Sequence, residues 1–242
     1  MIIYLHGFAS STTSSKATYL GKRFREHGLR FEIPVLNLPD FSTLTVTRML
    51  DQVDALLNGG PERPALRTME SRGAALSGPP KTTIIGSSLG GFVAVNAAAA
   101  WPERIDRLVL LAPALDFNRL QDLGGVRLDE WKRVDRLMVF HYGYGRMMPV
   151  HYGLYEDARQ YDAMHADVEM PVLVFQGGRD TAVDPRSVET WSRQRPNVEL
   201  HMLDDDHQLT SSLPYIWDVT SRFLDISQQS GPAASSRAPG RE

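Results

Sequence analysis

The sequence predicts a single α/β domain in which helices cover both faces of a mostly parallel sheet. Short apolar runs alternate with longer segments whose apolar residues recur at helical spacing, as in chains built from β–α–β units. The central runs are apolar throughout, which is typical of strands covered on both faces. With 242 residues, 42% of them hydrophobic, the chain can bury such a core without disulfide or metal cross-links.

Each expected strand is a short apolar run. We place about six strands, at residues 2–5, 31–35, 83–85, 108–111, 172–175 and 198–203. The segments between them have helical spacing of apolar residues, or glycine and proline where helices begin and end. We expect helices at residues 14–27, 44–57, 89–100, 185–193 and 213–224.

Helix ends are marked by residues that are favoured there. Serines open the first helix, and Gly28 follows its last turn. Pro102 stops the third helix, while Pro185 opens the fourth, because a helix tolerates proline in its first turn.

Three segments interrupt the alternation. Residues 58–81 are rich in Gly, Pro, Ser and Arg and are expected to form a mobile surface insertion. Residues 116–167 contain no clear strand, so we predict two or three helices around an aromatic and methionine-rich loop, forming a small helical cap. Residues 228–242 have too few apolar side chains to fold and are predicted to be a disordered tail, which leaves residues 1–227 as the domain.

Composition excludes several classes of function. The chain has no cysteine, which removes disulfide scaffolds, thiol catalysis and cysteine-ligated metal sites. A formal net charge of −3 provides no broad basic surface for nucleic acid. No apolar run approaches the roughly 18 residues of a membrane span, and residues 1–6 lack the basic start of a signal peptide. We therefore expect a soluble, cytoplasmic protein that binds neither nucleic acid nor a membrane.

The sequence Gly86-Ser87-Ser88-Leu89-Gly90 matches the pattern G-x-S-x-G between an expected strand and an expected helix. A sharp turn there raises the Ser88 hydroxyl above the sheet edge, and the flanking glycines let strand and helix approach. The helix start directs unpaired N–H groups at that hydroxyl, so the Leu89 N–H is a candidate oxyanion donor. Ser87 is one residue out of phase and is expected to face the fold.

The alternative at this turn is a structural one, in which both serines satisfy backbone groups. A phosphate-binding loop has no support, because G-x-G-x-x-G is absent and no Gly-Lys-Ser/Thr follows. Ser88 is the predicted nucleophile.

A second donor is expected from Leu5-His6-Gly7-Phe8, which follows the first strand. A His-Gly turn at a strand end can direct the Phe8 N–H at the serine, giving two donors for the oxyanion of a tetrahedral intermediate. His6 itself is expected to be buried and to hold the loop.

An acid and a base follow later strands. Asp180 comes after the strand at 172–175, and His207 after the strand at 198–203. Because ligand sites gather at the carboxyl ends of parallel strands, Ser88, Asp180 and His207 should share one edge of the sheet. Serine needs such a base, and the base needs an orienting carboxylate.

Other candidates fit structural roles better. Asp184 precedes Pro185 and suits a helix N-cap. The acidic run 204–206 lacks histidines at metal-ligand spacing, so no metal is expected there. Five further histidines are assigned to packing, helix-end, surface or lining positions: His27, His141, His151, His165 and His201.

Taken together, these motifs resemble those of the α/β-hydrolases, and most closely those of a compact bacterial serine esterase-like group. The resemblance covers nearly all of residues 1–224, and the serine–acid–histidine order is that of the family. It rests on Leu5-His6-Gly7-Phe8, Gly86-Ser87-Ser88-Leu89-Gly90-Gly91, Gly177-Gly178-Arg179-Asp180 and Asp206-His207. It implies a Ser-Asp-His triad acting on acyl substrates, and a cap inserted after the strand that ends near Pro113.

Two departures from the family pattern are visible. Met1 begins at what would be the third strand, so the usual leading β-hairpin is absent. Asp204-Asp205 precedes Asp206-His207 at positions where such esterases more often carry glycine. The loop that carries His207 is therefore expected to differ in shape from the family pattern, while the histidine itself is retained.

The expected function is hydrolysis of carboxylic esters of small to medium hydrophobic acyl or alkyl groups, through an acyl-enzyme on Ser88 and without a cofactor or metal. The partner is a small-molecule ester. Apolar side chains of the insertion could line the acyl site or form the cap's own core. The candidates are Phe117, Met138, Phe140, Tyr142, Tyr144, Met147 and Met148, to which Phe8 is added.

Other uses of the same triad remain open. An acyl-CoA thioesterase is the main alternative, with Arg119, Arg127 and Lys132 as candidate anchors for the carrier. Peptidase and acyltransferase chemistry use the same three residues. A non-catalytic binding protein fits less well because serine, acid and histidine are all present, and a dehalogenase would need a carboxylate in place of Ser88.

Overall fold

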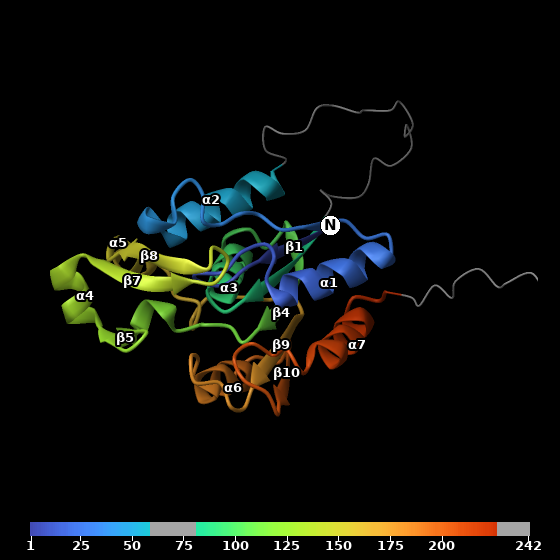
Figure 1. Cartoon of the computed structure of the whole chain (residues 1–242). Coiled ribbons are helices and arrows are strands. Elements are labelled where there is room, and N and C mark those ends of the chain that lie inside the picture. Colours follow the sequence, from blue (N-terminus) through green and yellow to red (C-terminus); the bar gives the residue numbers. More distant parts are fainter. Residues whose placement is uncertain (59–80, 227–242) are drawn as a thin grey trace, which may run out of the picture.

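The computed structural model describes residues 1–58 and 81–226. Its centre is a six-stranded sheet with strand order β10-β9-β4-β3-β1-β2 and parallel pairing throughout (Figure 1). The predicted parallel sheet of six strands is therefore confirmed. Its strands are β1 (Ile2–Leu5), β2 (Phe31–Glu32), β3 (Thr82–Ser87), β4 (Ile105–Leu111), β9 (Val172–Gly177) and β10 (Val198–Leu203).

Helices cover both faces of this sheet, because successive strand residues point to opposite sides. Ile3 and Leu5 of β1 join a core with α2 (Val46–Leu57), α3 (Leu89–Ala100) and α6 (Pro185–Arg193). Ile2 and Tyr4 join a second core with α1 (Ser15–Glu26) and α7 (Leu213–Phe223), which lie next to each other in Figure 1. The uniformly apolar strands thus reflect burial on both faces, as predicted.

The five helices beside the sheet lie where the sequence predicts them, to within two residues at each end. Three begin with a side-chain cap of the expected kind. Ser14 accepts from the Ala17 N–H, Thr45 from the Arg48 N–H and Asp184 from the Arg186 N–H. The N-cap role predicted for Asp184 is thereby confirmed.

The insertion between β4 and β9 is not purely helical, and this part of the prediction is wrong. It contains η2 (Phe117–Arg119), the pair β5 (Asp122–Leu123) and β6 (Val126–Arg127), α4 (Leu128–Val134), the hairpin of β7 (Arg136–His141) and β8 (Arg146–His151), and α5 (Gly153–Ala158). The sequence of β7 does not alternate between apolar and polar residues, because both of its faces carry apolar side chains, so it was not recognised as a strand. Leu137 and Val139 pack against the core, while Met138 and Phe140 are exposed.

The strand order places the loops after β1 and β3 side by side. β2 pairs with one side of β1 and forms an edge of the sheet. The chain then crosses over β1, so that β3 pairs with its other side, and β4, β9 and β10 follow in that direction. At such a reversal of strand order, a crevice opens at the carboxyl ends of the strands. A short helix, η1 (Phe41–Thr43), lies against β8.

Two predicted segments fall outside the described residues: nearly all of the insertion at 58–81, and the tail at 228–242. Within the described parts of the chain, no helix has the length and apolar character needed to cross a membrane.

Candidate active site

Ser88 lies on the sharp turn between β3 and α3. Its backbone has φ 53° and ψ −120°, in a region that residues with side chains rarely adopt. The turn is held by β4, because the Ser88 N–H donates to the Leu111 carbonyl (3.0 Å) and the Ser88 carbonyl accepts from the Ala114 N–H (3.1 Å). The Ser88 side chain is thus fixed above the sheet edge, while Ser87 is buried, as its phase predicts.

This turn can form only because glycine flanks it. A Cβ on Gly86 would lie 2.5 Å from the Gly90 carbonyl oxygen, and a Cβ on Gly90 would fall onto the carbonyl oxygen of Leu5. The helix start therefore packs directly on the end of β1, at a distance that no side chain allows.

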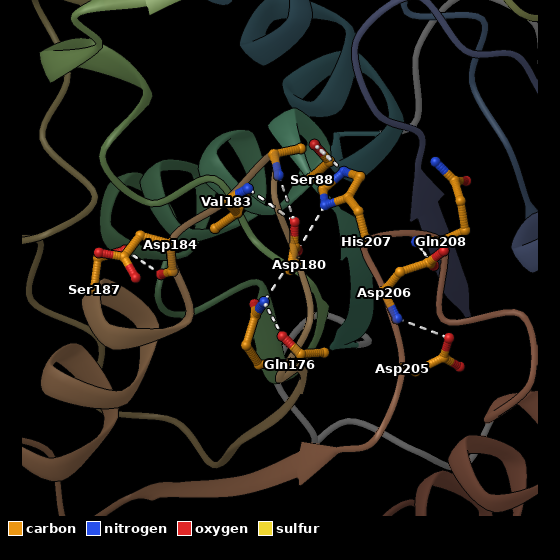
Figure 2. A network of polar contacts seen from close by, with 12 residues as sticks. Ser88, Gln176, Asp180, Val183, Asp184, Ser187, Asp205, Asp206, His207 and Gln208 are labelled. Atoms are coloured by element: carbon orange, nitrogen blue, oxygen red, sulfur yellow. Dashed lines mark hydrogen bonds and ion pairs between the residues drawn. The ribbon is translucent and has the colours of Figure 1, made fainter.

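The structure brings Ser88, Asp180 and His207 together, although they lie far apart in the sequence (Figure 2). His207 Nε2 lies 3.1 Å from Ser88 Oγ, and His207 Nδ1 lies 2.8 Å from Asp180 Oδ2. Both distances are within hydrogen-bonding range. The order of atoms is that of nucleophile, base and orienting acid.

Asp180 is held rigidly. One carboxylate oxygen accepts from the N–H groups of Ala182 (2.8 Å) and Val183 (2.9 Å), and the other accepts from Gln176 Nε2 (3.0 Å) in addition to facing His207. Burial raises the pKa of this carboxyl group, but the hydrogen bonds from His207 and the two N–H groups outweigh it, so the net pKa lies below its usual value. The group stays ionised at neutral pH.

Gln176 was not singled out in the sequence. The available signal was a polar residue at the end of an otherwise apolar strand, four positions before the acid. Its side chain is completely buried in β9, where its amide nitrogen donates to Asp180, while its Oε1 has no hydrogen-bond partner among the described residues.

The residues 204–209, here called the histidine loop, owe their shape to the acidic run. The Asp205 carboxylate accepts from the N–H and the hydroxyl of Ser212 at the start of α7 (3.0 and 2.8 Å). Asp206 accepts from the Gln208 N–H (2.8 Å), and Asp204 forms an ion pair with Arg179. Asp204 and Asp205 therefore anchor the loop to its neighbours.

Lys16, from α1, also contacts the histidine loop and was not singled out in the sequence. Its side chain is only 6% exposed, and Nζ donates to the His207 carbonyl oxygen (3.1 Å). The sequence signal was a lysine four residues before Leu20, on the apolar face of the predicted helix.

The loop after β1 lies against the serine. A Cβ on Gly7 would be 3.1 Å from Ser88 Cβ, so the chain at Gly7–Phe8 passes directly beside the hydroxyl. Leu89 is the first residue of α3, where helix N–H groups have no partner within the helix. Within the described residues, neither the Phe8 nor the Leu89 N–H has a hydrogen-bond acceptor.

His6 holds this loop from inside. Its Nε2 accepts from the Leu36 N–H (3.2 Å), and its Nδ1 lies 3.0 Å from the Gly7 carbonyl, to which it donates in the matching neutral form. Burial lowers the pKa of His6, and the neighbouring His141 lowers it further, against the effect of the Gly7 hydrogen bond. The buried, structural position expected for this histidine is what the structure shows.

His141 is buried, although a surface or lining position was expected. It stacks on Tyr144 with ring centres 4.1 Å apart and meets Phe41 edge-on. Asn37 Nδ2 lies 3.1 Å from His141 Nε2 and donates to the Ser10 carbonyl (2.9 Å). Asn37 thereby connects the β7–β8 hairpin to the segment after Phe8.

The predicted substrate-binding residues fall into two groups. Phe8, Phe117 and Met148 pack against the core, Phe8 beside Phe41 and Phe117 beside Phe92. The exposed group lies on β7–β8 and comprises Met138, Phe140, Tyr142, Tyr144 and Met147. The Tyr142 N–H connects this group to the segment after Phe8, because it donates to the Ala9 carbonyl (2.8 Å).

Comparison with known families gives two partial matches. Residues 1–66 match the model of an uncharacterised protein family (UPF0227), and residues 74–157 match the model described as alpha/beta hydrolase fold. No curated protein matches the sequence.

Solved structures resemble most of the chain. Est1E from Butyrivibrio proteoclasticus, with ferulic acid bound, is 19% identical with a TM-score of 0.75, over 92% of this chain and 87% of that one. Mouse alpha/beta hydrolase domain-containing protein 10 is 19% identical with a TM-score of 0.68, over 93% and 90%. A structure of the metagenome-derived lipolytic enzymes LipS and LipT is 18% identical with a TM-score of 0.68, over 93% of each chain. These matches confirm the α/β-hydrolase fold.

Proposed function

Since the chain has the α/β-hydrolase fold, we propose that it is a serine hydrolase that cleaves carboxylic esters through an acyl-enzyme on Ser88. One observation carries the proposal. His207 lies between Ser88 Oγ (3.1 Å) and Asp180 Oδ2 (2.8 Å), with one imidazole nitrogen facing each. A serine hydroxyl becomes a useful nucleophile at neutral pH only with such a base and orienting acid beside it.

In the first step, His207 Nε2 accepts the Ser88 proton while Oγ forms a bond to the ester carbonyl carbon. The carbonyl oxygen becomes an oxyanion, which the N–H groups of Leu89 and Phe8 stabilise. Asp180 remains ionised and stabilises the imidazolium. His207 then returns its proton to the alcohol oxygen as the C–O bond breaks, which leaves the acyl group on Ser88.

In the second step, water takes the place of the alcohol. His207 accepts one water proton as the water oxygen attacks the acyl carbon, and the same two N–H groups hold the oxyanion. The intermediate collapses with transfer of that proton to Ser88 Oγ, so the enzyme returns to its starting state and the acid is released.

The substrate is an ester with a hydrophobic acyl or alkyl group of small to medium size. The exposed apolar residues of β7–β8 support this, since the hairpin is tied through Tyr142 and Ala9 to the segment after Phe8. Est1E, whose structure contains ferulic acid, is consistent with an aromatic group. The acyl-CoA alternative is weaker, because two of its candidate anchors, Arg119 and Arg127, are paired with Asp162 and Asp129, and the third, Lys132, lies over the Tyr152 ring (5.9 Å).

The direct test is labelling with a fluorophosphonate probe, followed by identification of the modified peptide. We expect modification of Ser88 in the wild type and none in Ser88→Ala, with ester hydrolysis lowered by roughly 10⁶-fold, as on loss of a triad nucleophile. Ser87→Ala is the matched control and should be labelled normally, because Ser87 is buried.

Substrate class is tested on the same samples with p-nitrophenyl esters of increasing chain length and with acyl-CoA. Ester hydrolysis should exceed thioester hydrolysis. Wild-type turnover by Ser88→Ala, or labelling at another residue, would contradict the proposal.

A further inference from the structure

Lys16 occupies an unfavourable place for a charged residue. It lies in the first turn of α1, where the partial positive charge of the helix N-terminus repels a cation. It is also buried, on the side of α1 that packs toward the sheet and α7, next to Ala17 and Leu20. Position and burial both cost stability, so some other interaction must account for the lysine.

That interaction is with the histidine loop. Lys16 Nζ donates to the carbonyl oxygen of His207, a residue 191 positions later in the chain. Of the loop's other contacts, Asp205 binds Ser212 at the start of α7, and Asp206 accepts from Gln208 within the loop. Within the described residues, the lysine is therefore the group that holds the backbone of the base itself.

Three carboxylates among the described residues act electrostatically on Lys16, and the neighbouring titratable group is the imidazole of His207, whose carbonyl the lysine contacts. Asp180 follows β9, and Asp205 and Asp206 belong to the histidine loop after β10. Burial lowers the pKa of Lys16 to about 8, while these three carboxylates act in the opposite direction. The side chain is thus an ammonium at neutral pH and loses its charge in mildly alkaline solution.

We propose that Lys16 is a positioning residue for the base of this site. Its ammonium fixes the backbone of His207 and offsets the carboxylates around the imidazole, so that the ring stays aligned between Asp180 and Ser88. This role rests on the proposed hydrolase function. It concerns the rate of the chemical step and not the binding of substrate.

The experiment compares Lys16→Met, which keeps length and packing, with Lys16→Gln, which keeps an N–H donor without charge. Lys22→Met is the control, since Lys22 lies on the same helix with its side chain in solvent. We expect Lys16→Met to lower kcat at pH 7 by roughly tenfold, the usual effect of losing one charge-assisted hydrogen bond, with KM nearly unchanged. Lys16→Gln should lie between Lys16→Met and the wild type. The thermal midpoint of Lys16→Met should stay the same or fall, because the substitution leaves the His207 carbonyl oxygen without its donor.

A second readout separates this role from simple packing. The ratio of wild-type to Lys16→Met activity should be largest at pH 7 and should shrink by about pH 9.5, because the wild-type lysine then loses its charge. Fluorophosphonate labelling of Ser88 should slow in parallel with kcat. Lys22→Met should match the wild type in every measurement.

Several results would overturn the proposal. These are Lys16→Met activity within about twofold of the wild type, an activity ratio that does not change with pH, or failure of both Lys16 variants to fold. Unlabelled wild type would instead show that the hydrolase function itself is wrong. Normal labelling of the wild type with equally fast labelling of Lys16→Met would remove only the role of Lys16.

Discussion

The histidine loop contacts Ser88 and the β7–β8 hairpin contacts the segment after Phe8, yet the two are built in opposite ways. The histidine loop is held by charged and polar contacts from Arg179 after β9, Ser212 before α7 and Lys16 of α1. The hairpin is tied down near its tip, at Tyr142 and His141, and presents Met138, Phe140 and Met147 to solvent. Under the proposed function, this difference means that the geometry of proton transfer is fixed, whereas the surface that would meet the substrate can adapt.

The largest effect is expected from Asp180→Asn, which tests the rigid geometry around His207. The amide cannot stabilise the imidazolium, and it favours the wrong imidazole tautomer, so kcat should fall by about 10³–10⁴-fold while the fold is retained. Steady-state hydrolysis of p-nitrophenyl acetate measures this. Asp184→Asn is the control, because asparagine also caps helices and Asp184 is exposed. Equal losses in both variants would contradict the assignment of Asp180.

A smaller but still large effect is expected from Gly177→Ala. Its Cβ would lie 2.5 Å from the Asp206 carbonyl oxygen and 2.6 Å from that of Asp205, so the histidine loop must move. A displacement of about 1 Å at a catalytic group can cost about 10²-fold in rate. Gly178→Ala is a matched control, because its nearest neighbour would be 3.4 Å away. Wild-type kcat in Gly177→Ala would show that the loop is less rigid than the structure indicates.

Acidic pH should lower the folding stability of the protein through His6 and His141, which pack near the loop that contains Phe8. Burial is the largest cause of the lowered pKa of both His6 and His141, so the unfolded chain binds protons at these histidines more readily than the folded chain does. Folding stability therefore falls as the pH drops below the ordinary histidine pKa near 6.5. Thermal midpoints measured between neutral pH and about pH 5 should decrease by a few degrees, since about 1 kcal/mol corresponds to about 2–4 °C in a domain of this size.

The change in midpoint with pH should be smaller in His6→Gln, which removes one of the two groups. His165→Gln serves as the control, because the His165 side chain is exposed. An unchanged pH dependence in His6→Gln would mean that other groups determine the acid sensitivity.

The smallest effect on stability is expected from the double variant Phe140→Ala with Met147→Ala, which tests whether the exposed face of the β7–β8 hairpin binds the substrate. These residues are cross-strand partners on the exposed face of the hairpin, so the free energy of unfolding should change by about 0.5 kcal/mol per substitution or less. Hydrolysis of long-chain esters should fall several-fold relative to acetate. An equal change for all chain lengths would place the acyl group elsewhere.

Much of the fold could be predicted from local pattern. The apolar run at 172–175 and the glycines around Ser88 each specify a local structure, and the strands and the sheet-packing helices lie where those patterns place them. The β7–β8 hairpin could not be predicted in this way. Its exposed face is as apolar as its buried face, so the alternation by which strands are recognised is missing.

The sequence by itself therefore determined the parallel sheet, the sharp turn that carries Ser88, and the expectation that Asp180 and His207 follow neighbouring strands. It could do so because apolar spacing and glycine act over a few residues. Only the tertiary structure decided which side chains meet across the chain, such as Asn37 with His141 and Lys16 with His207. Such contacts depend on how α1 and the strands pack against one another, and packing over 191 positions leaves no local pattern to recognise.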